Sequence, residues 1–91
     1  MAGLLIRPRL VTGARLQYDE VREEHMLLVP EGVVRLNPTA AEVLELCDGE
    51  RSLEEIVETL SGRYEGSDLR SDVQGLVDGM TQRGLVVDAA A

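Results

Sequence analysis

The stretch LLVPEGVVRLNPTAAEVL, residues 27–44, contains two strand signals, a turn and the start of a helix. Two apolar runs flank the segment PEG, residues 30–32. Its proline fixes its own φ and its glycine tolerates a positive φ, so we expect a type I turn closed by a glycine bulge. Asn37 suits a helix N-cap and Pro38 the first helical position. The stretch therefore predicts a hairpin, with residues 33–36 as its returning strand, followed directly by a helix.

Two more strands are expected before this turn. Residues 14–20 alternate, with Leu16 and Tyr18 on one face and polar side chains on the other, which is the period of a half-buried strand. Residues 25–29, HMLLV, have the composition of a short buried strand. If the three strands form a simple meander, residues 33–36 lie at a sheet edge, where N–H and C=O groups remain unpaired.

Three helices are expected after the strands, because apolar residues recur there at helical spacing. The start signals are Asn37, the capping box of Ser52 with Glu55, and either Ser67 or Asp68. Gly49, as a left-handed cap, and Gly84 are expected to end the first and last helices. The three apolar stripes are Ala40, Val43, Leu44 and Cys47; Leu53, Ile56, Val57 and Leu60; and Leu69, Val73, Leu76, Val77 and Met80. The apolar tail that follows either adds a strand or packs on the core.

The order of elements predicts an α+β fold, in which an N-terminal three-stranded antiparallel sheet is followed by a three-helix bundle. Its shape is like a winged helix-turn-helix with the hairpin placed first. A chain of 91 residues suffices for one domain and is too short for two. Residues 1–13 show no sustained period and are interpreted as a flexible or loosely docked N-terminal arm. Residues 14–88 are interpreted as the single domain.

Composition excludes several classes of function. Hydrophobic residues make up 44% of the chain but aromatic residues only 2%, so the core must be aliphatic. The net charge of −8 argues against a nucleic-acid partner, which is bound by neutralising its phosphates. No signal peptide is recognisable, and no run approaches the roughly 20 apolar residues of a membrane helix. With one cysteine and no internal disulfide, we expect a cytoplasmic protein without a membrane partner.

No set of side chains suggests catalysis, a metal site or a cofactor. His25 is the only histidine and is interpreted as a solvated turn residue. Cys47 falls on an apolar stripe and is interpreted as a buried, inert thiol. The many acidic side chains indicate a solvated face, or alternatively a surface that meets a basic partner. We therefore expect no active site, and neither a metal nor a cofactor.

Two features depart from an ordinary small domain. Gly75 and Gly79 lie inside the expected last helix, where each costs up to about 1 kcal/mol relative to alanine. They indicate either tight packing or tolerated substitutions, or else close approach of another backbone. The strand at 33–36 is guarded only by Arg35, so an extended peptide can pair with it. Alternatively, the N-terminal arm or a second copy of the chain covers this edge, so a homodimer is possible.

Residues 15–60, RLQYDEVREEHMLLVPEGVVRLNPTAAEVLELCDGERSLEEIVETL, resemble the PqqD family of pyrroloquinoline quinone biosynthesis. The resemblance extends from about Arg7 to Leu85. Its strongest pieces are PEG, LN followed by TA, LCDG and the capped EIV helix. DVQGLVDGMTQRGL is similar to the family's last helix, although Gly75 and Gly79 stand where bulkier residues are expected.

The resemblance implies a peptide chaperone without catalytic activity. Family members are recognition elements that bind the precursor peptide PqqA by strand addition and present it to PqqE, a radical S-adenosylmethionine enzyme. The peptide-binding residues implied here are Val33, Val34, Arg35 and Leu36 on the strand and Leu69, Asp72, Val73, Gly75 and Leu76 on the last helix. The alternatives are a recognition domain of another peptide-modification pathway and a winged-helix DNA-binding module.

Overall fold

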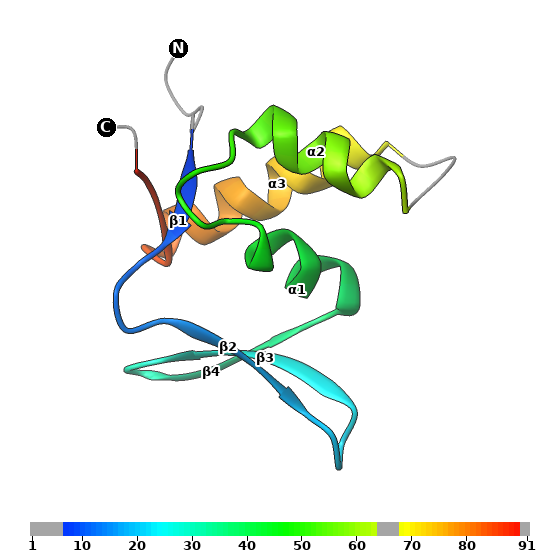
Figure 1. The fold of residues 1–91 in the computed structure, drawn as a ribbon. Coiled ribbons are helices and arrows are strands. Elements are labelled where there is room, and N and C mark those ends of the chain that lie inside the picture. Colours follow the sequence, from blue (N-terminus) through cyan, green and yellow to red (C-terminus); the bar gives the residue numbers. More distant parts are fainter. Residues whose placement is uncertain (1–6, 64–67, 90–91) are drawn as a thin grey trace.

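The computed structural model describes residues 7–63 and 68–89. Its fold is α+β, as predicted (Figure 1). A three-stranded sheet lies on one side of the helices, α1 is the helix nearest to it, and β1 and β5 lie together beside the helices. In chain order the elements are β1 Pro8–Leu10, β2 Arg15–Asp19, β3 Glu24–Val29, β4 Gly32–Leu36, α1 Pro38–Glu45, α2 Leu53–Ser61, α3 Leu69–Gln82 and β5 Val86–Asp88.

The larger sheet is antiparallel, with the strand order β2-β3-β4, so β4 is an edge strand. The hairpin between β3 and β4 is tighter than expected. Val29 pairs directly with Gly32, which leaves a two-residue loop and places the glycine inside the ladder. Gly32 has a φ of 151°, which glycine adopts without strain. This register continues with Leu27 opposite Val34, and Leu27 is fully buried.

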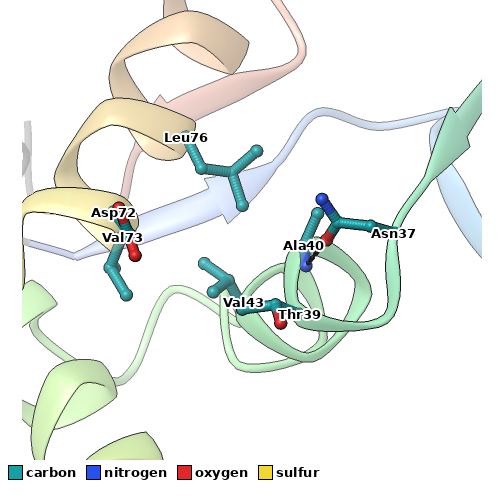
Figure 2. Close-up of a pocket in the computed structure, with 7 residues that line it drawn as sticks. All are labelled: Asn37, Thr39, Ala40, Val43, Asp72, Val73 and Leu76. Atoms are coloured by element: carbon teal, nitrogen blue, oxygen red, sulfur yellow. Dashed lines mark hydrogen bonds between the residues drawn. The ribbon is translucent and has the colours of Figure 1, made fainter. Parts of the chain in front are cut away.

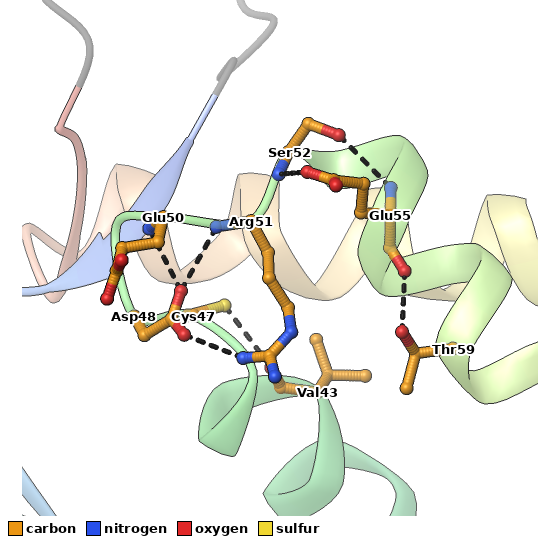
Figure 3. A network of polar contacts seen from close by, with 8 residues as sticks. All are labelled: Val43, Cys47, Asp48, Glu50, Arg51, Ser52, Glu55 and Thr59. Carbon is orange, nitrogen blue, oxygen red and sulfur yellow. Dashed lines mark hydrogen bonds and ion pairs between the residues drawn. The ribbon is translucent and has the colours of Figure 1, made fainter.

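All three helices begin where their caps predict. The Asn37 side chain accepts the N–H of Ala40 at 2.7 Å, and Pro38 is the first helical residue. Ser52 and Glu55 form the reciprocal capping box (Figure 3). Asp68 caps α3 by accepting the N–H of Ser71, whereas Ser67, the other candidate, lies outside the described residues. These predictions are confirmed because caps are local signals that need no tertiary context.

The prediction for the end of α1 is wrong. The helix ends at Glu45 with Leu46 as its C-cap, so Gly49 lies in the loop that follows. Gly49 has a φ of 83° and its N–H donates to the Pro8 carbonyl at 3.0 Å. An added Cβ would lie 3.1 Å from side-chain atoms of both Arg9 and Ala89. Glycine is therefore required here for close approach to β1 as well as for its backbone conformation.

β1 pairs with β5 in a second, two-stranded antiparallel sheet, with Pro8 opposite Asp88 and Leu10 opposite Val86. The interpretation of residues 1–13 as a flexible or loosely docked arm is therefore wrong for residues 8–10, where Pro8 is also buried. Three residues are too few to show a period, and their partner lies near the other end of the chain. The apolar tail after α3 was expected either to add a strand or to pack on the core, and it forms the added strand β5.

The core is aliphatic and lies between the helices and the larger sheet. It includes Leu27 from β3, Leu44 from α1, Ile56 from α2 and Val77 from α3. Cys47 belongs to the same cluster and its thiol donates to the Val43 carbonyl at 3.3 Å. Burial raises the pKa of this thiol to about 12, with a smaller contribution from the nearby Asp48 carboxylate. The prediction of a buried, inert thiol is confirmed.

His25 is a strand residue, not the solvated turn residue that was expected. It is half-buried in β3, opposite Tyr18 on one side and Leu36 on the other. Its ring centroid lies 4.7 Å from that of Tyr18, at an interplanar angle of 51°. This pair stabilises the β2-β3 ladder, as cross-strand aromatic pairs generally do.

Candidate functional site

The outer side of β4 is an unpaired strand edge. In the two-residue loop, the Val29–Gly32 pair that closes the turn is expected to be hydrogen-bonded, so Leu27–Val34 should be the next bonded pair. The main-chain N–H and C=O groups of Val33 and Arg35 then point away from β3. No strand of the described part of the chain pairs with this side. Val33 is 56% exposed, so the edge is also open to solvent.

A hollow lies where β4 leads into α1, opposite the N-terminal half of α3 (Figure 2). Its volume is about 350 Å³. Figure 2 shows that its walls come from two helices: Asn37, Thr39, Ala40 and Val43 from the start of α1, and Asp72, Val73 and Leu76 from α3. The walls are mainly apolar, and the Asp72 carboxylate lies on the α3 side. The hollow can accept one or two side chains of a peptide.

A second hollow, of about 180 Å³, lies at the other end of β4. It is formed by the hairpin loop, the start of β4 and the segment that follows α3; its lining residues are Val29, Glu31, Gly32, Val33, Val34, Arg83 and Leu85. The start of β4 thus faces the end of α3, while the end of β4 faces the N-terminal half of α3. Strand and helix therefore run in opposite directions, with a hollow at each end of β4.

The structure brings together most of the predicted site residues. Val33 and Arg35 are exposed at the edge, while Val34 and Leu36 are half-buried and pack against the core. Of the helical residues, Asp72, Val73 and Leu76 line the larger hollow.

Leu69 and Gly75 do not line either hollow of β4. Leu69 is buried in the core at 8% exposure, one turn before Val73 on the inner face of α3. Gly75 lies on another face of α3, in a surface depression together with Ser71, Gln74 and Asp78. A Cβ at Gly75 would meet nothing within 4 Å, so tight packing does not explain this glycine.

The wall that α1 contributes was missed from the sequence. Asn37 and Pro38 were recognised as a helix start, and Ala40 and Val43 as an apolar stripe, but these residues were assigned only to the core. The available signal is the absence of any linker between β4 and α1. Because the helix begins at once, its first turn must lie beside the end of the edge strand.

Several acidic side chains outside the hollows have local structural roles. The Asp48 carboxylate accepts the N–H groups of Glu50 at 2.9 Å and Arg51 at 3.1 Å, and it pairs with the Arg51 guanidinium (Figure 3). These contacts, led by the Glu50 N–H, lower the pKa of Asp48. Glu54 pairs with Arg70 and joins α2 to α3, which lowers the pKa of Glu54. These carboxylates are explained without a partner protein.

Within residues 7–63 and 68–89, no group of three or more His, Cys, Asp or Glu side chains is placed to hold a metal ion. In the same residues no helix is long and apolar enough to cross a membrane.

Comparison with known proteins gives consistent matches. A family model described as Coenzyme PQQ synthesis protein D (PqqD) matches residues 24–86, which include β4, α1 and α3. A PqqA binding protein of Methylococcus capsulatus is 36% identical over 77 residues, which cover 85% of this chain and 83% of that protein. The bifunctional coenzyme PQQ synthesis protein C/D of Methylorubrum extorquens is 36% identical over 78 residues, or 84% of this chain and 21% of that protein.

Two solved structures share the fold. The solution structure of the PqqD truncation of Methylobacterium extorquens PqqCD superposes with a TM-score of 0.76 at 34% identity, covering 88% of this chain and 87% of that one. That protein is described as a functional, stand-alone recognition element for ribosomally synthesised and post-translationally modified peptides. Lasso peptide synthetase B1, complexed with its leader peptide, has a TM-score of 0.73 at 22% identity, which shows a common fold alone.

Proposed function

Because the chain belongs to the PqqD family, we propose that it is a peptide-binding adaptor of pyrroloquinoline quinone biosynthesis. In this proposal it binds the precursor peptide PqqA as an added strand on β4 and presents it to the radical S-adenosylmethionine enzyme PqqE. The adaptor itself performs no chemistry. Relatives that carry the name PqqA binding protein, and a solved relative described as a recognition element, support this function.

The observation that carries the proposal is the open edge of β4 between two hollows. A guest strand would pair with the outward groups of Val33 and Arg35. Alternate guest side chains would point to the same side of the sheet as Val34 and Leu36, toward α3. Main-chain pairing then supplies affinity for any extended peptide, and the hollows supply selectivity.

The energetics fit an adaptor that must release its peptide. Binding would form about four main-chain hydrogen bonds, worth roughly 0.5–1.5 kcal/mol each, and bury two or three apolar side chains. These gains must offset the entropy that the peptide loses when it becomes ordered. The net affinity is therefore moderate. Because most of it is apolar and main-chain in origin, it should depend only partly on salt.

An amide NMR titration of the labelled protein with a synthetic PqqA peptide tests this function. We expect shifts to concentrate at residues 32–37 on β4, 39–43 on α1 and 72–76 on α3, while α2 and β1 change little. Shifts confined to other faces would retain an adaptor and reject this site. No shift at high peptide concentration, with or without PqqE present, would reject PqqA as the guest.

A recognition domain of another peptide-modification pathway is the second candidate function, because strand addition to β4 would serve any extended guest. Titration with leader peptides of other pathways alongside PqqA separates the two, since the true guest should bind more tightly. A winged-helix DNA-binding role is disfavoured by the net charge of −8. Specific band shifts with DNA at low salt would revive it.

A homodimer would form by pairing two β4 edges, so it would compete with the peptide for the same groups. Sedimentation with and without PqqA peptide tests this, because added peptide should then dissociate the dimer. A cytoplasmic location follows from the proposed partnership with PqqE and is tested by fractionation of cells.

A further inference from the structure

The larger hollow is uneven in charge. Among the described residues that line it, Asp72 alone carries a formal charge and none is an arginine. The other lining side chains are the apolar Ala40, Val43, Val73 and Leu76 and the neutral Asn37 and Thr39, and the Asn37 oxygen already accepts the N–H of Ala40. A guest side chain in this hollow therefore meets apolar walls and one carboxylate.

The Asp72 carboxylate has no partner of its own. Across residues 7–63 and 68–89, no hydrogen bond or ion pair engages its side chain, and the nearest arginine in sequence, Arg70, is paired with Glu54. Asp72 itself is exposed. It lies in the first turn of α3. An unpaired carboxylate at the rim of an apolar hollow favours a cationic guest.

Lysine and arginine have the shape that such a hollow accepts. Their methylene chains can lie along Val43, Val73 and Leu76 while the charged end stays at the solvent-exposed rim. The ammonium or guanidinium group then donates to the Asp72 carboxylate. The N-terminus of α1 carries a partial positive charge, which favours an anion instead. The Asn37 side chain already accepts one N–H group there, and this partial charge is smaller than the full charge of Asp72.

The other end of β4 has no such preference. Arg83 and Glu31 both line the smaller hollow, so opposite charges are present there in equal number. Residues 72, 76, 79 and 83 repeat along one face of α3, and Asp72 and Arg83 are about 16 Å apart along it. This length matches about five residues of an extended guest. Gly79 leaves open space between the two ends, because a Cβ there would meet nothing within 4 Å.

We propose that Asp72 selects a lysine or arginine at one position of the bound peptide and thereby fixes the register and direction of the guest strand. This inference rests on the proposed strand addition to β4. Antiparallel pairing is the more common and slightly more stable arrangement. It places the basic residue at the N-terminal end of the docked segment, beside the end of β4, with the next four to five residues running toward Gly32.

A positional lysine scan tests the inference. Single lysines are placed in turn along a synthetic PqqA peptide, and each peptide is compared with its glutamine counterpart for binding to the unchanged protein and to Asp72→Asn. We expect one position at which lysine binds about two- to fivefold more tightly than glutamine, the size of an exposed ion pair. The preference should vanish in Asp72→Asn and persist in Asp78→Asn, a control on another face of α3.

A nitroxide label on the peptide tests direction. Placed four residues after the preferred lysine, it should broaden the amides of Gly32 and Val33 more than that of Thr39; the reverse pattern would overturn antiparallel docking. Peptide that binds with no lysine preference, or with one that survives in Asp72→Asn, would overturn the role of Asp72 and leave the proposed function standing. Tighter binding by Asp72→Asn would indicate an acidic guest residue. Failure of every peptide to bind would overturn the proposed function and this inference together.

Discussion

At the scale of single residues, exposure separates the two apolar side chains that α3 contributes to the larger hollow. Val73 is 1% exposed and belongs to the core, whereas Leu76 is half-buried with part of its surface in the hollow. A charge at Val73 would therefore report on folding and not on binding. Leu76 is the residue at which binding can be changed while the core is kept.

Leu76→Asp should weaken binding of the PqqA peptide about tenfold or more. It removes apolar contact worth roughly 1–2 kcal/mol and puts a hydrated carboxylate where the methylene chain of the guest would lie, so binding must desolvate that charge. Titration calorimetry measures the change, and circular dichroism verifies the fold. Ser71→Asp adds the same charge to the same helix on another face and should bind normally. A folded Leu76→Asp protein with unchanged affinity would exclude this hollow from the site.

Cys47 predicts a dependence of stability on alkaline pH. Its pKa is about 12 in the folded protein, above the ordinary value of 9.0, so the unfolded chain loses the thiol proton first. Stability is therefore unaffected below pH 9 and decreases as the pH rises toward 12, by up to about 1.4 kcal/mol per pH unit. Urea unfolding at pH 8 and pH 10 measures this difference. Cys47→Ala should lower the free energy of unfolding at both pH values. The decrease in stability that the thiol causes between pH 8 and pH 10 should then be absent.

At the scale of elements, β4 differs from the opposite edge strand, β2, in what lies beside it. Both strands leave one side unpaired. The edge of β4 lies between the larger hollow, which α1 and α3 line, and the smaller hollow beside the segment that follows α3. The hollow beside β2 is smaller than both, at about 120 Å³. We therefore expect a guest to add to β4 and not to β2.

Val33→Pro tests this choice of edge. Proline removes an N–H that points outward, so the β3-β4 ladder keeps its hydrogen bonds while a guest loses one. Binding of the PqqA peptide should weaken about five- to tenfold. Tyr18→Pro is the matched control, because the register places the Tyr18 N–H on the outer side of β2. Equal affinity in both variants and the parent would show that β4 is not the docking edge.

How far the sequence predicts these elements depends on the distance over which each signal acts. Asn37, Ser52 and Asp68 mark their helices because a cap contacts residues only two or three positions away. The pairing of β1 with β5 has no local signal, so it was missed. In the site, the edge strand and Leu76 follow from periodicity. Leu69 lies in the core and Gly75 on another face of α3, because tertiary packing sets the rotation of α3 about its axis, and their contact with a guest stays a prediction.

At the scale of the whole molecule, Gly49 joins the helical layer to the small sheet at the chain ends. Its loop donates to Pro8 and leaves space for Arg9 and Ala89. The contact lies away from the two hollows of β4. Stability and binding should therefore respond separately to a change at this position.

Gly49→Ala should destabilise the protein by about 1–2 kcal/mol, because its φ of 83° and the 3.1 Å approach of Arg9 and Ala89 both disfavour a Cβ. Urea unfolding measures the loss, and peptide affinity should be unchanged while the protein is folded. Gly62→Ala is the control, since Gly62 has a φ of −73° and the nearest neighbour of an added Cβ is at 3.9 Å. Similar losses in both variants would show that the close approach at Gly49 contributes little.

The pairing of β1 with β5 also bears on the order in which the chain folds. The β3-β4 hairpin closes a loop of two residues, whereas Pro8 meets Asp88 across nearly the whole sequence. Each doubling of separation adds roughly 0.6 kcal/mol of closure entropy, so the terminal pair should assemble last and open first. During synthesis on the ribosome, the residues of β4 are complete before those of β5 have been added. Amide exchange should accordingly be faster in β1 and β5 than in β3.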